Sequence, residues 1–367
     1  MELDWSPSPS SFRVLATLVG LSLLGLGCDT GASTSASQPD FTTANCTIPT
    51  SRINSGCAGG ADCIPAINNI APGDDRLRDG RPDGLRADDR VIGLLFGEQA
   101  LAVPHKILWT HEIVNVDEWA GRTFAITYCP LTGTSIAFDR SAIDGAEFGV
   151  SGLLFNNNLM MYDRGEDEAS LWPQMSKQAT CGANVGTSLS TLPVIEMEWE
   201  QWRELHPDTQ VLDDGNGFNR EDPYGDYDED LSSPPLFDMP VDDRRLPKER
   251  VLGIPAGEDG GLALPFAELN GVGDSVNVVT VPVGGTEKTV FWDREARTAM
   301  AFETSTAFSV QEGQIVDAET GSVWSVEGRA LEGTRAGERL PVDREAYVGF
   351  WFAWAAFQPE TEIWEQS

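Results

Sequence analysis

The chain is short of basic residues. Among its 367 residues, 25 are lysine or arginine and 58 are aspartate or glutamate, which gives a formal net charge of -33 and a pI of about 4.2. Nucleic acids and anionic membrane surfaces bind proteins through basic patches, so neither is an expected partner. The acidic excess is expected to form a solvated surface.

Motifs that identify several common protein classes are also missing. The sequence holds no G-x-G-x-x-G, no P-loop, no H-E-x-x-H and no C-x-x-C-H. These absences argue against dinucleotide, nucleotide-phosphate, zincin and c-type haem functions. Histidine is scarce as well, since the chain has three, and imidazole chemistry is therefore limited to His105, His111 and His206.

An apolar run near the N-terminus is too short to span a bilayer comfortably. Residues 14–27 (VLATLVGLSLLGLG) follow Arg13 and lead directly to Cys28. The pattern resembles a bacterial lipoprotein signal, in which a peptidase cuts before the cysteine and the thiol is lipidated. We predict a signal peptide over 1–27 and a lipidated, cysteine-containing tether over 28–63. The predicted location is the cell envelope outside the cytoplasm, anchored to a membrane facing the periplasm, with secretion as the alternative.

Five cysteines follow Cys28, and an odd number leaves at least one thiol free or paired between chains. An exported compartment permits disulfides. Three of the five lie close together in a Gly-rich stretch, where we predict a disulfide staple whose connectivity stays open. The five are Cys46, Cys57, Cys63, Cys129 and Cys181.

Several blocks of the sequence recur in the same order. FAITYCPLTGT (124–134) matches VNVVTVPVGGT (276–286), and WEQWRELHPDT (199–209) matches WFAWAAFQPET (351–361), both without a gap. Recurrence of this kind predicts two tandem, structurally similar halves that arose by internal duplication.

The segments within each half predict a β-rich fold. Short apolar and β-branched runs separated by Gly, Pro, Asn and Asp indicate mainly antiparallel strands, with a few short helices. The predicted domains are a first β-rich repeat over 64–212 and a second, degenerate repeat over 248–367. An acidic connection rich in Tyr, Gly and Pro joins them over 213–247. A connection of this length is either functional or a linker.

Candidate chemistry is confined to the first repeat. The sequence match sets Cys129 opposite Val281, and the second repeat has no histidine that corresponds to His105 or His111. Neutral imidazole and thiolate are ligands that suit copper or zinc. We therefore predict a metal site built on His111 and Cys129, with His105 as a weaker ligand.

Further groups are expected around this site. Met160 and Met161 suit copper, although methionine in a strand is more often part of the core. Polar residues nearby are candidates for orienting the ligands through hydrogen bonds: Glu112, Asn115, Asp139 and Arg140. Two alternatives stay open. Cys129 is either a catalytic nucleophile activated by His111 or a buried structural thiol.

Long stretches of the sequence resemble a known family. The stretches include IPAI, VIGLLFGEQALAVPHKILWTHEIVN, TYCPLTGTSIAFDR, FGVSGLLFNNNLMMYDR, DPYGDYD and RLPKERVLG. Over about 64–361 the chain is similar to a bacterial and archaeal family defined as a domain of unknown function, DUF3179. His111 and Cys129 fall on the family's WHEIVND and YCPL motifs. Thr132 stands where the family often has a second cysteine, so a CxxC pair is excluded.

The resemblance implies a fold and no established activity. The first hypothesis from the sequence is therefore a lipid-anchored envelope protein with a copper or zinc site, acting as a carrier or a redox protein. A non-catalytic binding or scaffold module, with the acidic connection as its contact surface, is the alternative from a different class. A thiol enzyme with a Cys-His pair is the third.

Overall fold

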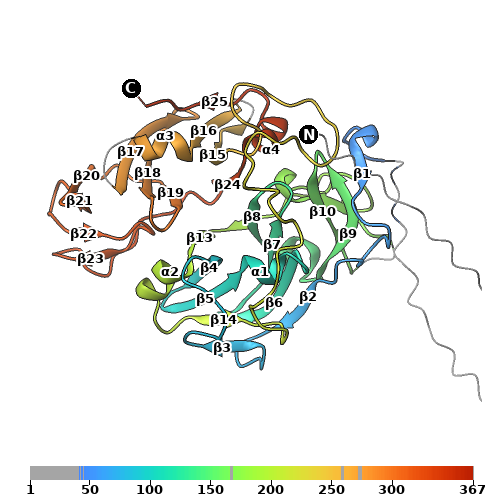
Figure 1. Cartoon of the computed structure of the whole chain (residues 1–367), viewed down its shortest axis with the longest axis horizontal. Coiled ribbons are helices and arrows are strands. Elements are labelled where there is room, and N and C mark those ends of the chain that lie inside the picture. Colours follow the sequence, from blue (N-terminus) through green and yellow to red (C-terminus); the bar gives the residue numbers. More distant parts are fainter. Residues whose placement is uncertain are drawn as a thin grey trace, which may run out of the picture. The chain divides into compact units, whose positions relative to one another are not determined.

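Strands dominate the computed structural model, which describes residues 41, 43, 45–165, 168–257, 260–271 and 275–366. Within these residues the strands form six sheets (Figure 1). The predicted β-rich, mainly antiparallel fold with a few short helices is confirmed. The predicted signal peptide, the lipidation site Cys28 and the start of the tether lie outside the described residues.

The first half holds three of the sheets. In spatial order, the first contains β1 (Ile53–Ser55), β9 (Phe148–Phe155), β10 (Asn158–Asp163) and β11 (Leu171–Pro173). The second contains β12 (Thr191–Leu192), β8 (Thr134–Asp139), β7 (Arg122–Cys129), β6 (Ile113–Trp119) and β2 (Ile67–Ile70). The third contains β13 (Ile195–Glu198), β4 (Arg90–Phe96), β5 (Gln99–Pro104), β14 (Gln210–Leu212) and β3 (Leu77–Asp79).

The second half holds the other three sheets. They contain β24 (Tyr347–Phe350), β15 (Arg250–Pro255), β16 (Gly261–Pro265) and β25 (Glu362–Ile363); then β17 (Val276–Val283), β18 (Thr286–Asp293) and β19 (Thr298–Phe302); then β20 (Phe308–Gln311), β21 (Gln314–Asp317), β22 (Val323–Trp324) and β23 (Ala330–Glu332). The helices are short: α1 (His105–Leu108), α2 (Trp199–Leu205), α3 (Phe266–Gly271) and α4 (Trp351–Phe357), with single 3-10 turns at Thr50–Arg52, Ser141–Ile143 and Gln174–Ser176. No helix in the described ranges has the length and apolar character needed to cross a membrane.

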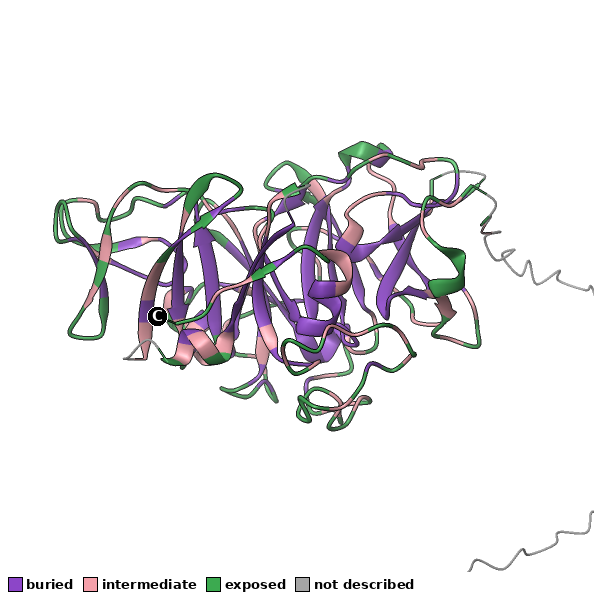
Figure 2. Ribbon diagram, turned by 90° about the horizontal axis from the view of Figure 1, so that it is seen from above, coloured by how far each residue is buried: buried purple, intermediate pink, exposed green. Residues whose placement is uncertain are grey.

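The core lies between the sheets. Figure 2 shows that the strands are largely buried, whereas the loops that join them are mostly intermediate or exposed. Tryptophans supply much of the buried volume, and burial of such large apolar surfaces is the main stabilising contribution. The fully buried tryptophans are Trp172, Trp199, Trp202, Trp292, Trp351 and Trp354.

One sheet in each half has the same strand order. The order β13-β4-β5-β14 in the first half matches β24-β15-β16-β25 in the second. In both sheets the first three strands pair antiparallel and the last strand pairs parallel. This geometry agrees with the predicted likeness of the two halves, and their origin by duplication stays a prediction.

A tryptophan lies on a glycine at the same place in both of these sheets. A Cβ added to Gly93 would lie 2.0 Å from the Trp202 ring, and one added to Gly253 would lie 2.2 Å from the Trp354 ring. Each tryptophan comes from the short helix, α2 or α4, that precedes the last strand of its sheet. The glycines are therefore required because the aromatic rings occupy the space of a side chain.

Gly93→Ala is expected to lower the free energy of unfolding by about 2–3 kcal/mol, because the methyl group forces the Trp202 ring out of its position. Gly253→Ala is expected to cost a similar amount through Trp354. Denaturant unfolding of both variants measures the effect. An unchanged midpoint in either variant would show that the ring does not pack on the glycine as described.

The strand order corrects the sequence match between the halves. The ungapped match equates β7 with β17 and Cys129 with Val281. In the structure β7 is the middle strand of β6-β7-β8, whereas β17 is the first strand of β17-β18-β19. Cys129 pairs with Thr134 across a hairpin, as Asp293 does with Thr298. Asp293 is thus the structural counterpart of Cys129, because similar apolar alternation let the sequence match slip by one strand.

The segment from Cys46 to Cys63 belongs to the folded part rather than to a tether. Disulfides join Cys46 to Cys181 and Cys57 to Cys63, while Cys129 is free and buried. Strand β1 also pairs with β9. The predicted staple is confirmed for Cys57 and Cys63. The predicted tether boundary at residue 63 is wrong, because backbone pairing and a long-range disulfide hold this segment on the first half.

Candidate functional site

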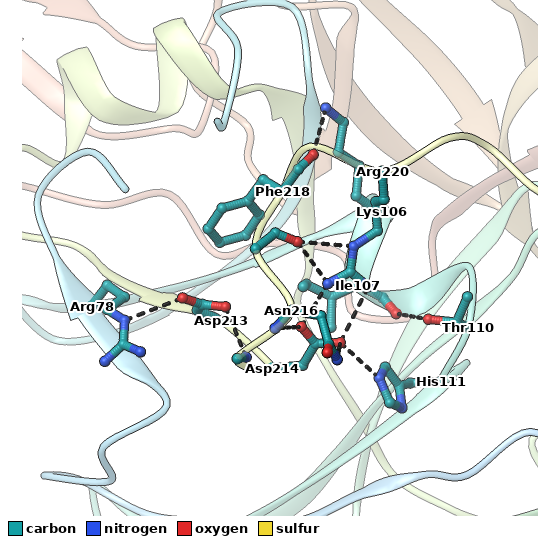
Figure 3. Close-up of polar contacts among 12 residues, drawn as sticks. Arg78, Lys106, Ile107, Thr110, His111, Asp213, Asp214, Asn216, Phe218 and Arg220 are labelled. Carbon is teal, nitrogen blue, oxygen red and sulfur yellow. Dashed lines mark hydrogen bonds and ion pairs between the residues drawn. The ribbon is translucent and has the colours of Figure 1, made fainter. Parts of the chain in front are cut away.

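His111, a predicted metal ligand, contacts two oxygen acceptors. Its Nε2 lies 3.0 Å from Oδ2 of Asp214 (Figure 3). Its Nδ1 lies 2.7 Å from the Pro65 carbonyl oxygen. A carbonyl and a carboxylate only accept hydrogen bonds, so both ring nitrogens of His111 face acceptors. Each nitrogen is thus engaged by an oxygen atom of the protein rather than left open toward a metal.

Asp214 ties the acidic connection to the first half. Burial opposes its ionisation, but the Arg220 guanidinium and the bonds from Asn216 and His111 outweigh burial and hold the pKa of Asp214 well below its usual range. Nearby, Lys106 donates to the Phe218 carbonyl at 3.3 Å (Figure 3). The role that the structure gives His111 is thus to anchor the segment that follows residue 212.

Cys129 lies in a different environment, at the end of β7. Its thiol is 1% exposed, lies 3.7 Å from the Asn157 carbonyl and accepts a bond from the Leu159 amide at 3.3 Å. Burial, together with the charge of Glu112, raises the pKa of the Cys129 thiol to about 11. No hydrogen bond or ion pair in the described structure joins Cys129 to His111.

His105 belongs to a third, separate cluster. Its ring stacks on Tyr128 with centroids 4.2 Å apart, and its Nε2 lies 3.5 Å from Oε2 of Glu196. Arg90 also pairs with Glu196, at 3.3 Å. Burial lowers the pKa of His105, which favours the neutral ring. His105, His111 and Cys129 therefore have separate sets of partners.

The remaining predicted residues, apart from Glu112, have structural partners. Arg140 is fully buried and binds Asp117 and the Val116 carbonyl. Asn115 donates to Asn68 and to the Phe148 carbonyl, and Asp139 accepts from the Ser141 amide. Met160 and Met161 are buried in two different apolar clusters. In the part of the chain that the structure describes, no group of three or more His, Cys, Asp or Glu side chains is placed to hold a metal ion.

The CPLTGT turn is held by a buried polar network. The Gln174 amide oxygen accepts from Thr134 at 2.6 Å and from Asn158 at 2.9 Å, while its nitrogen donates to Thr127 at 2.8 Å. Thr132 joins the network by a 2.8 Å bond to Thr134. Because every member is buried and bonded, the network stabilises one conformation of the turn.

A cavity of about 290 Å³ lies where several of the family-like stretches meet. Its lining is mainly apolar and comes from the β9–β10 hairpin, the turn after β7, the segment near Cys57 and the acidic connection. The lining residues used below are Glu112, Leu131, Leu153, Tyr224, Tyr227 and Leu236. A largely apolar pocket with few polar groups is the usual form of a small-molecule site.

Glu112 is the acid in the wall of this pocket. Glu112 as a whole is 6% exposed. No side-chain hydrogen bond or ion pair joins its carboxyl to any residue that the structure describes. Burial raises the pKa of Glu112 to about 8. A buried, unpartnered carboxyl with a perturbed pKa in a cavity is a functional-site candidate.

The backbone holds Glu112 in an uncommon conformation. Its φ is +56°, its amide donates to the Leu108 carbonyl at 2.9 Å, and its carbonyl accepts from the Tyr128 amide at 2.8 Å. A non-glycine residue with positive φ carries strain, and such strain is concentrated at functional sites. The bonds on both sides fix this residue at the junction of α1 and β6.

Two tyrosines of the acidic connection form another wall of the pocket. The Tyr224 hydroxyl donates to the Trp109 carbonyl at 3.4 Å, and the Tyr227 hydroxyl donates to the Leu131 carbonyl at 3.1 Å. Their hydroxyls are therefore engaged with the first half and their rings line the cavity. The acidic connection is thus part of the site rather than a free linker.

The sequence predicted a role for Glu112 only in the metal site, as a residue that orients the ligands or adds a further one. The signal that could have singled it out is an acid directly before the apolar run of β6, where a solvated carboxylate is unexpected. The pocket that Glu112 lines, however, is walled in part by the acidic connection, more than a hundred residues later in the chain, and no local pattern shows that contact.

Fold and pocket together define the class: a β-rich protein whose first half carries an apolar, carboxyl-containing pocket walled by an acidic connection. The chain belongs to the DUF3179 family, described as a protein of unknown function, whose model matches residues 61–361. No curated protein and no solved structure matches the chain significantly. The resemblance seen in the sequence is confirmed at the level of the family, and membership of a lipoprotein type stays a prediction.

Proposed function

We propose that this protein is a binding module of the cell envelope that holds a small, largely apolar molecule in the Glu112 pocket. The observation that carries the proposal is a buried carboxyl without a partner in the wall of an apolar cavity. Leaving such a group unpaired costs free energy, and a ligand that pairs with it recovers part of that cost.

Export and anchoring are part of the same proposal. Two disulfides are typical of a protein that matures in an oxidising compartment. The lipoprotein-like segment before Cys28 supplies the expected anchor. A binding module held on a membrane needs no catalytic group, which agrees with a thiol that is buried and protonated at neutral pH.

The copper or zinc site stays a prediction from the sequence. The geometry does not favour it, because both nitrogens of His111 face oxygen acceptors and Cys129 has other partners. Elemental analysis of the purified protein is its direct test. The thiol enzyme also stays a prediction that the geometry does not favour, since no hydrogen bond or ion pair in the described structure joins His111 to Cys129.

Leu153→Trp is expected to abolish ligand binding, because a larger side chain on β9 fills the cavity that Leu153 lines. A set of neutral, cationic and anionic fragments is screened by ligand-observed NMR against the purified protein. Fragments that bind the wild type are expected to bind the variant at least ten-fold more weakly.

The matched control is Leu95→Trp. Leu95 is also a half-buried strand leucine, but it lines a different cavity, between β4 and β12. This variant is expected to keep the fragment signals. Equal loss of binding in both variants, or no fragment that binds the wild type, would refute the pocket as a ligand site.

A further inference from the structure

We propose that the ligand of this pocket is a small organic cation, a protonated amine on a short apolar group, which pairs with the Glu112 carboxylate. The inference rests on the proposed binding function. Glu112 lacks a countercharge within the described structure, and the walls of the pocket are mainly apolar. A carboxylate in such a place is costly unless it is paired, so a cation is the ligand that completes the site.

The tyrosine wall suits the same ligand. The hydroxyls of Tyr224 and Tyr227 are already bonded to backbone carbonyls, so the rings are the surface that these residues offer to the cavity. Aromatic faces attract cations. One face of the Tyr227 ring already carries such a contact, because Nζ of Lys248 lies 3.2 Å from its centroid. Tyr224 is therefore the tyrosine of this wall that has no cation on its ring within the described residues.

The charge around the pocket favours cations over anions. Residues 222–230 (DPYGDYDED), which supply the tyrosines, contain five acids, and the whole chain has a net charge of -33. One of the five, Asp228, is paired with Arg250 at 3.0 Å. Negative potential at a cleft raises the local concentration of cations and disfavours anionic ligands.

A neutral ligand bound to protonated Glu112 is the competing possibility. The number of protons released on binding distinguishes it from a cation. Pairing with a cation requires that Glu112 lose its proton, whereas a neutral ligand accepts a hydrogen bond from it. Burial is what raises the pKa of Glu112; the titratable groups near it are Cys129 and Tyr224, whose own pKa values are raised by burial and by the charge of Glu112. His111, its neighbour in sequence, faces Asp214 instead.

Benzylamine and benzyl alcohol are the probes, titrated calorimetrically into the full-length protein at pH 6, 7 and 8. The two molecules share one apolar group and differ in the charged head. We expect the amine to bind at least ten-fold more tightly than the alcohol, with an affinity that rises toward pH 8. Titration at pH 7 in two buffers of different ionisation enthalpy is expected to show release of about one proton per amine bound.

Two variants complete the test. Glu112→Gln is expected to weaken amine binding at least ten-fold and to leave the alcohol unchanged. Asp226→Asn removes the same charge from an exposed position on the acidic connection and is expected to change amine binding less than two-fold. Equal binding of amine and alcohol, an unaffected Glu112→Gln variant, or no binding of benzylamine would each overturn the inference. The Leu153→Trp fragment experiment decides separately whether the pocket binds ligands at all.

Discussion

Glu112→Gln is expected to stabilise the folded protein at pH 8.5 by about 5 kcal/mol, at about 1.4 kcal/mol for each unit of pKa. The unfolded carboxyl ionises near 4.5 and the folded one near 8, because burial favours the neutral form. Between these values the folded state holds the extra proton, so its stability falls as the pH rises. Glutamine has no proton to lose, so the variant avoids this loss.

Below pH 4.5 the two proteins are expected to have nearly equal stability, because Glu112 is then protonated in both states. Thermal unfolding of the wild type and the variant at pH 4 and pH 8.5 measures the difference. A variant that is less stable than the wild type at pH 8.5 would show that the carboxylate has a partner, and the pocket would lose its distinguishing group.

Glu196→Gln is the matched control, and its expected effect has the opposite sign. Burial opposes ionisation of Glu196 too, but His105 and the Arg90 and Arg250 guanidinium groups outweigh it and lower its pKa to about 2. The folded state therefore holds fewer protons between about 2 and 4.5, and this stabilisation is present above 4.5 and lost as the pH falls toward 2. Removing the charge is expected to cost about 3 kcal/mol at pH 7, because it leaves buried cations unpaired.

Removal of the Cys46–Cys181 disulfide is expected to lower the free energy of unfolding by about 4–5 kcal/mol. The bond closes a loop with a sequence separation of 135 residues, and a long loop loses much chain entropy when it is cross-linked in the unfolded state. The variant Cys46→Ala/Cys181→Ala is compared with the wild type by urea unfolding. A fall in the midpoint is expected, with proteolysis becoming faster in the segment before residue 64.

The second disulfide is the internal control. Cys57–Cys63 spans a sequence separation of 6, so Cys57→Ala/Cys63→Ala is expected to cost only about 2 kcal/mol on the same argument. Equal losses for the two pairs would mean that native contacts, rather than loop closure, decide the contribution. In that case the bonds between residues 45–47 and 180–182 would be the main attachment of this segment.

The structure gives the acidic connection a different role from the one that its composition indicates. Its composition is typical of a solvated linker, and its charge pattern shows no binding motif. In the structure Asp214, Tyr224 and Tyr227 are among the residues that anchor it to the first half, and it forms one wall of the pocket. Its function is therefore decided by where it docks rather than by its own residues.

Much of the fold was predictable from local pattern. Alternating apolar residues and Gly/Pro punctuation predict short antiparallel strands, and the structure confirms them because a half-buried strand needs that alternation. The staple formed by Cys57 and Cys63 was predictable because the two cysteines are close in the chain. The long quoted stretches were sufficient to recognise the family.

The candidate site was not predictable in the same way. His111 and Cys129 lie on neighbouring sequence motifs of the first predicted repeat. In the structure, however, His111 contacts Asp214, whereas Cys129 lies in the core beside Leu159. His111 lies in the turn between α1 and β6, whereas Cys129 is the last residue of β7, so their places in neighbouring motifs do not set what they touch. Apolar residues alternate with a period of two along every strand, and this similarity let the sequence match between β7 and β17 slip by a whole strand.

The sequence by itself thus determined the family, the β-rich fold and the strongly acidic surface, because these depend on composition and on short-range alternation. Only the tertiary structure decided that Glu112 is buried without a partner, that His111 anchors the acidic connection, and that Cys46 bonds to Cys181. Each of these depends on segments that are distant in the chain. The environment of a side chain, and hence its charge state and chemistry, is set by those distant contacts.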